Sequence, residues 1–117
     1  MLQVPIILFA IAALGGLYMA VCIFKGSFAP WALSILHALL GASGLVLILI
    51  SVLQGARGLV AGALIILAIA AIGGFYLASY HVRRQLAPKS IVAIHAVVAV
   101  TGFLVLLVAA FGSGTGN

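Results

Sequence analysis

The sequence has no aspartate and no glutamate, and charged residues make up only 4% of its 117 positions. Without these side chains the protein cannot use paired carboxylates for acid/base catalysis, nor build a calcium or magnesium site from Asp and Glu. A small four-helix proton-coupled multidrug transporter, which relies on a membrane-embedded Glu, is excluded for the same reason. The single cysteine, Cys22, excludes an intrachain disulfide, a CxxC redox pair and a c-type haem attachment motif.

What the sequence does contain is apolar side chains, which form 68% of the chain. An ordinary soluble domain is about half apolar and about a quarter charged. A soluble globule of this composition would expose large apolar patches and aggregate. The composition therefore predicts a protein of the lipid bilayer.

Four apolar runs cover residues 4–24, 30–53, 59–80 and 90–111. Each run is long enough, as a helix rising 1.5 Å per residue, to cross a hydrocarbon core of about 30 Å. Short polar or glycine-containing breaks separate the runs. We expect four membrane-spanning helices and no soluble domain.

Lysines and arginines are distributed unevenly between the connections. The first and third connections hold Lys25, Arg83, Arg84 and Lys89, whereas the second holds only Arg57. Positively charged loops stay in the cytoplasm. This pattern predicts cytoplasmic loops near residues 25–29 and 81–89, with both termini outside, and we expect the bacterial inner membrane as the location.

The chain repeats itself at a fixed offset of 58 residues. Aligning 10–49 with 68–107 gives 14 identities in 40 positions, where chance would give about 4 for this composition. The shared residues include the least common types, namely a paired glycine, Tyr18 with Tyr76, Pro30 with Pro88, and His37 with His95.

This repeat predicts an all-α protein made from a duplicated two-helix hairpin, with residues 1–57 as the first repeat and 58–117 as the second. Because each repeat has two spans, both enter the membrane from the same side, related by a pseudo-twofold axis along the membrane normal. The simplest architecture is an integral membrane four-helix up-down-up-down bundle, in which the second and fourth helices are diagonal neighbours.

His37 and His95 are the strongest candidates for chemistry. Each lies seven residues after its proline, about 10 Å into the membrane. Ionisable residues at that depth usually face the interior of a bundle. Gly44 and Gly102 share the face of each histidine, and we expect them to leave an open slot beside each imidazole, wide enough for a flat macrocycle.

We therefore predict one b-type haem with His37 and His95 as its axial ligands. Tyr18 and Tyr76 are expected in the same layer, where they would orient the ring or an imidazole. Two histidine ligands leave no open iron position, which favours electron transfer over oxygen activation. The cations Lys25, Arg83, Arg84 and Lys89 would meet the haem propionates or, alternatively, the headgroups of anionic lipids.

In plan, a four-helix bundle with axial histidines on two helices resembles the membrane cytochromes b. Those proteins usually carry two haems and four histidines, whereas this sequence has only one pair of histidines within its spans.

The alternative is a non-catalytic accessory or scaffold subunit without cofactor, in which Tyr18 and Tyr76 hydrogen-bond the histidines and lock the helices together. A pigment, a quinone, a proton relay and a metal ion also remain open. Under either hypothesis we expect a lipid bilayer and other membrane protein subunits as partners, no nucleic acid, and no enzyme activity of the chain on its own.

Three smaller features complete the expectations. The stripe Ala12, Gly16, Ala20 recurs as Ala70, Gly74, Ala78 and predicts close helix packing. Pro30 and Pro88 are expected in the first turn of their helices. His81, in a basic loop, is expected to be solvated.

Overall fold

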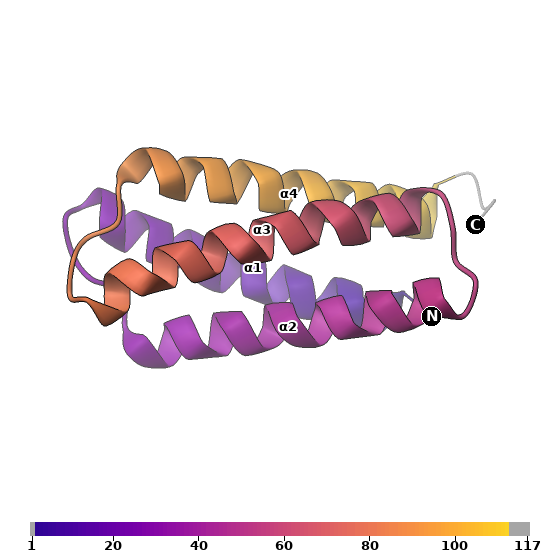
Figure 1. Ribbon diagram of the computed structural model, residues 1–117, viewed down its shortest axis with the longest axis horizontal. Coiled ribbons are helices and arrows are strands. Elements are labelled where there is room, and N and C mark those ends of the chain that lie inside the picture. The colour runs from indigo at the N-terminus through magenta and orange to yellow at the C-terminus, as the bar shows by residue number, and fades with distance from the viewer. Residues whose placement is uncertain (1, 113–117) are drawn as a thin grey trace.

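The computed structural model describes residues 2–112 and contains four helices there (Figure 1). They are α1 (Gln3–Phe24), α2 (Trp31–Leu53), α3 (Leu59–Val82) and α4 (Lys89–Phe111). All four are long and apolar enough to cross a membrane. The prediction of an all-helical chain with four candidate spans is confirmed, and the helix bounds agree with the apolar runs to within two residues.

The helices run side by side and form a four-helix bundle (Figure 1). Packing is most extensive within the hairpins α1–α2 and α3–α4; α2 also packs on α3, and α1 on α4. Within the described residues the backbones of the diagonal helices stay apart. The bundle measures 45 × 20 × 19 Å, and its length matches a bilayer of about 40–45 Å with its headgroups. Large apolar side chains cover its outside, such as Leu14 at 70% exposure, which suits a surface in contact with lipid.

The two ends of the bundle differ in charge. The α1–α2 and α3–α4 loops lie at one end, and the start of α1, the end of α4 and the α2–α3 loop lie at the other (Figure 1). We call these the basic end and the termini end. The basic end carries Lys25, Arg83, Arg84 and Lys89, and the termini end carries Arg57.

Pro30 and Pro88 precede their helices instead of forming the first turn. Their ψ angles of 135° and 133° are extended, so that the helices begin one residue later. The expectation was wrong by this one position. Each proline carbonyl still accepts an early helical hydrogen bond, from Ser34 N at 3.0 Å and from Val92 N at 3.2 Å.

Helices α1, α2 and α3 end in the same way. The residue after each C-cap has a positive φ: Gly26 at 82°, Gly55 at 116° and Arg84 at 58°. In each case the next N–H donates to the carbonyl five residues back, at 2.9–3.0 Å. This is the Schellman motif, which turns the chain sharply and satisfies a carbonyl at the helix end.

The large apolar core lies in the half of the bundle near the termini end. It consists of Phe9, Ile48, Val60, Ala63, Leu67 and Leu106. Toward the middle of the bundle, the next buried residues of α1 and α3 are alanines, Ala12 and Ala70. These small side chains leave room for larger groups from α2 and α4 at the same level.

His81 is not simply solvated, contrary to expectation. Its imidazole stacks on the indole of Trp31, with ring centroids 3.8 Å apart and planes at 12°, and the ring of Phe28 lies 5.8 Å away. Because His81 is in α3 and Trp31 begins α2, the stack joins the two hairpins at the basic end. The rings of Phe28 and Trp31 therefore lie against an imidazole that was expected to be surrounded by water.

Candidate functional site

His37 of α2 and His95 of α4 are each held by the other helix of their own hairpin. His37 Nδ1 lies 2.8 Å from the carbonyl oxygen of Ala12, and His95 Nδ1 lies 2.9 Å from that of Ala70. A carbonyl can only accept, so each Nδ1 carries the proton and donates it. In the neutral imidazole, Nε2 then keeps its lone pair, and this is the form of histidine that binds a metal.

Glycines on α1 and α3 make room for these two rings. A Cβ on Gly16 would lie 2.9 Å from His37 Cε1, and a Cβ on Gly74 would lie 3.1 Å from His95 Cε1. A larger residue at Gly16 would force the imidazole of His37 to shift, and one at Gly74 would press on that of His95. The small-residue stripes thus pack the helices closely, as predicted. They also leave the space that each imidazole occupies.

The two imidazoles approach each other across the diagonal of the bundle. Their centroids are 6.4 Å apart and their planes are inclined at 75°. Both side chains are part-buried. Among the described residues neither Nε2 has a hydrogen-bond partner, and neither atom is fully enclosed. The site therefore presents two free imidazole nitrogens near the bundle axis.

The separation of the rings can be compared with known ligand geometry. Two metal–imidazole bonds of about 2 Å, plus about 1 Å from each nitrogen to its ring centre, span about 6 Å. The observed centroid separation of 6.4 Å is close to this span for an arrangement in which both Nε2 atoms face the metal. Within residues 2–112 no group of three or more His, Cys, Asp or Glu side chains could hold a bare metal ion. A metal that brings four ligands of its own, as haem iron does, needs only two from the protein.

The slot expected beside Gly44 and Gly102 is filled. A Cβ on Gly44 would lie 2.6 Å from Phe9 Cζ, and a Cβ on Gly102 would lie 2.7 Å from Leu67 Cγ. The two glycines therefore receive core side chains from α1 and α3. This part of the expectation was wrong, because the sequence does not reveal which large side chain a neighbouring helix inserts.

The tyrosines do not pair with the histidines. Tyr18 is 56% exposed and Tyr76 is 51% exposed. The hydroxyl of Tyr76 lies 3.1 Å from that of Tyr80, on the outside of α3. Backbone carbonyls have taken the place that the tyrosines were expected to fill beside the imidazoles.

No family model, no curated protein and no solved structure matches this chain. Its function is therefore argued from the geometry of the site.

The four cations at the basic end are all exposed. Arg83 is turned toward the outside of α3, where its Nε donates to Ser79 O at 3.2 Å and its Nη2 donates to Ser79 Oγ at 3.3 Å. The structure thus places Arg83 away from the axis between the histidines. Arg84 follows in a left-handed backbone conformation.

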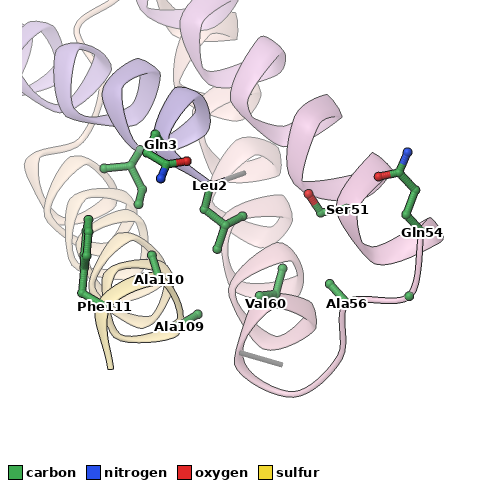
Figure 2. A pocket seen from close by; sticks show the side chains of 11 residues that line it. Leu2, Gln3, Ser51, Gln54, Ala56, Val60, Ala109, Ala110 and Phe111 are labelled. Carbon is green, nitrogen blue, oxygen red and sulfur yellow. The ribbon is translucent and has the colours of Figure 1, made fainter. Parts of the chain in front are cut away.

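A hollow of about 450 Å³ opens at the termini end (Figure 2). Three polar side chains line it beside apolar ones, namely Gln3, Ser51 and Gln54. Ser51 already donates to the carbonyl of Leu47 at 3.2 Å. None of the lining side chains is ionisable, and the hollow lies at the opposite end of the bundle from the basic loops.

The carbonyls of Ala12 and Ala70 are the site groups that the sequence did not identify. Every residue has a backbone carbonyl, so the residue type does not show which carbonyl accepts a hydrogen bond. One signal was available, since each alanine precedes the paired glycine of its repeat by the same number of residues and thus shares a helix face with Gly16 or Gly74.

Proposed function

We propose that the protein is an electron-transfer protein of the membrane that holds one b-type haem between Nε2 of His37 and Nε2 of His95. The observation that carries the proposal is the pair of imidazoles, 6.4 Å apart, with each Nδ1 anchored to a backbone carbonyl. Haem bound there would supply one-electron redox chemistry.

The chain's own groups have distinct tasks in this proposal. The carbonyls of Ala12 and Ala70 fix the tautomer and orientation of each imidazole, as outer-shell partners of metal-bound histidines commonly do. Inclined ring planes suit a shared iron, since ligation by two histidines does not require their planes to be parallel. A haem held by both histidines would transfer electrons and would not bind oxygen.

Phe9 and Leu67 fill the space between the histidines and the termini end. In this proposal a macrocycle would therefore have to lie on the side of the basic end, where Lys25 and Lys89 would offer positive charge to its propionates. Tyr18 and Tyr76, which are exposed, have no direct part in this arrangement.

The whole protein is proposed to be a subunit of a larger membrane complex, in the bacterial inner membrane, and not an enzyme on its own. Four cations at one end against one at the other support cytoplasmic loops at the basic end and both termini outside. A four-helix bundle without a soluble domain among the described residues needs a partner that exchanges electrons with it.

The proposed origin of the site is a duplicated hairpin, with repeats 1–57 and 58–117. Several contacts support it, because both partners recur after 58 residues: His37 with Ala12 and His95 with Ala70, and likewise Gly44 with Phe9 and Gly102 with Leu67. A pseudo-twofold axis along the membrane normal explains why two histidines meet at one depth.

An optical spectrum tests the haem proposal. The protein, expressed with ample haem supply and purified in detergent, should show a sharp b-type band on reduction. His37→Ala and His95→Ala should each lose the band or convert it to a high-spin form. His81→Ala is the matched control, because His81 stacks on Trp31 outside the pair and its loss should leave the band in place.

Colourless protein from haem-supplied cells, or a band that survives both substitutions of the pair, contradicts the proposal. A band lost equally in His81→Ala would mean that the spectrum reports general unfolding and not ligation.

The accessory-subunit alternative also has a specific observation in its favour. Each histidine already ties α2 to α1 or α4 to α3 through its bond to a carbonyl, which is a structural role that needs no cofactor. If the protein is colourless and His37→Asn, whose amide can still donate, melts like the parent while His37→Ala melts lower, this alternative holds.

A further inference from the structure

The outer face of α3 carries a connected polar cluster at the basic end, formed by Tyr76, Ser79, Tyr80 and Arg83. The guanidinium of Arg83 lies 4.7 Å from the centroid of the Tyr80 ring. Two hydrogen bonds to Ser79, from Nε and from Nη2, hold it in that position. The hydroxyls of Tyr76 and Tyr80 lie 3.1 Å apart, with their rings edge to face.

Hydrogen-bond donors of this cluster remain unused. A guanidinium has five N–H donors, and Ser79 accepts from only two of the nitrogens of Arg83. The tyrosine pair shares one O–H between two oxygens and so has a second O–H to spare. No carboxylate side chain exists anywhere in the sequence to accept from them. An anionic acceptor for these donors would therefore come from another molecule.

The position of the cluster indicates which molecule. Arg83 is the C-cap of α3, where the span ends, and Phe75 and Val82 beside it are 66% and 68% exposed on the apolar outside of the bundle. An arginine at the end of a span lies at the level of the lipid headgroups. A second copy of this chain cannot neutralise it, because that copy has no Asp or Glu either.

We propose that this cluster is a binding site for the phosphodiester of an anionic phospholipid. The planar guanidinium, fixed on one edge by Ser79 and on one face by Tyr80, offers its remaining N–H donors in the fork that suits phosphate oxygens. The spare O–H of the tyrosine pair adds another donor. The lipid chains lie along the apolar surface of α3. Arg84 in the adjoining loop and Lys89 at the start of α4 favour an anionic over a zwitterionic headgroup. This site is independent of the haem proposal.

The first hairpin supplies a built-in comparison. At the positions 58 residues earlier it has Tyr18, Val21, Cys22 and Lys25. Val21 and Cys22 cannot hold a cation as Ser79 and Tyr80 do, so Lys25 is a lone ammonium at the same end of the bundle. General attraction between basic loops and lipid would treat Lys25 and Arg83 alike, whereas a built site makes only Arg83 essential.

Native mass spectrometry of the purified full-length protein tests the proposal. Detergent micelles would contain defined amounts of phosphatidylglycerol or phosphatidylcholine. We expect the parent to retain one phosphatidylglycerol with preference over phosphatidylcholine. Arg83→Gln should lower that affinity by about tenfold or more, since hydrogen bonds to a charged group are removed. Lys25→Gln, the matched control, should change it by only about twofold.

Two further variants test the proposal if Arg83→Gln folds poorly. Tyr80→Phe keeps the ring beneath the guanidinium and removes one hydroxyl, and Arg83→Lys keeps the charge and removes the fork. Both should weaken phosphatidylglycerol binding more than Lys25→Gln does, with unchanged helical circular dichroism.

Three results overturn the proposal. Equal losses in Arg83→Gln and Lys25→Gln mean that only general charge attracts the lipid. Unchanged phosphatidylglycerol affinity in Arg83→Gln means that the lipid does not bind at this cluster. Displacement of the lipid by millimolar inorganic phosphate, with the same dependence on Arg83, means that the site takes free phosphate.

Discussion

At the residue scale, Arg84 occupies a backbone conformation that favours glycine. Its φ of 58° lies in the left-handed region, and Gly26, its counterpart in the first hairpin, has a φ of 82°. The following N–H closes the same bond in both places, from Ser27 to Cys22 and from Gln85 to Tyr80. A side chain in this conformation costs roughly 1 kcal/mol, so the second hairpin carries strain that the first avoids.

Arg84→Gly should raise the free energy of unfolding by up to about 1 kcal/mol, because glycine adopts this conformation without strain. Lys25→Gly is the matched control. It removes the same charge at a position whose φ is −86°, and it should bring no gain. Reversible unfolding in mixed detergent micelles measures both. Equal changes in the two variants would show that charge, and not backbone strain, controls the effect.

The sequence shows the residue type and the depth of the two histidines, and these were enough to predict them as the central pair. The sequence does not show which groups accept hydrogen bonds from the two imidazoles. A backbone carbonyl is present at every position, so only the packed structure reveals that Ala12 and Ala70 supply the acceptors. The tyrosines were the obvious side-chain partners, and they point outward.

At the scale of elements, the glycines of α1 and α3 control how closely each hairpin packs. A Cβ on Gly16 would clash with the imidazole of His37, and a Cβ on Gly74 would be tight against that of His95. Gly41, one turn beyond His37, has nothing within 4 Å of the position its Cβ would take. The glycines of this protein therefore differ in whether they can be replaced by a residue with a side chain.

Gly16→Ala should lower the free energy of unfolding by about 1–3 kcal/mol, as overpacking does, and Gly74→Ala should lower it by less, because the contact there is looser. Gly41→Ala should be neutral or stabilising by up to about 1 kcal/mol, because alanine favours the helix, and Ala99 already stands at the equivalent position. Thermal unfolding of the three purified variants measures this. Similar melting of all three would mean that the imidazoles move aside without cost.

At the scale of the whole molecule, the fold separates charge to one end and the large apolar core to the other half. The basic end holds four cations and the stack of His81 on Trp31. The termini end holds Arg57 and the hollow shown in Figure 2. A bilayer with an anionic, cytoplasmic leaflet at the basic end would match this asymmetry.

A reporter that fluoresces only in the cytoplasm, fused after Asn117, should give no signal, and a periplasmic phosphatase at the same place should be active. The physical reason is the retention of the basic loops on the cytoplasmic side. As a control, the same reporters fused after Gln85, in the α3–α4 loop, should give the opposite result. Cytoplasmic fluorescence at Asn117 would reverse the orientation proposed here.

The sequence by itself determined the bilayer environment, the four spans, and the location of the cations at one end. These are properties of composition and of runs along the chain, and no tertiary contact alters them. The spacing of His37 and His95 from their prolines also placed both at one depth.

Only the tertiary structure decided how each helix is rotated about its axis. The helices are apolar on nearly every face, so periodicity carries little signal for which side points inward. For this reason the insertion of Phe9 and Leu67 against Gly44 and Gly102, the outward tyrosines and the stacking of His81 could not be predicted. They depend on close approach between segments distant in the chain, which packing alone determines.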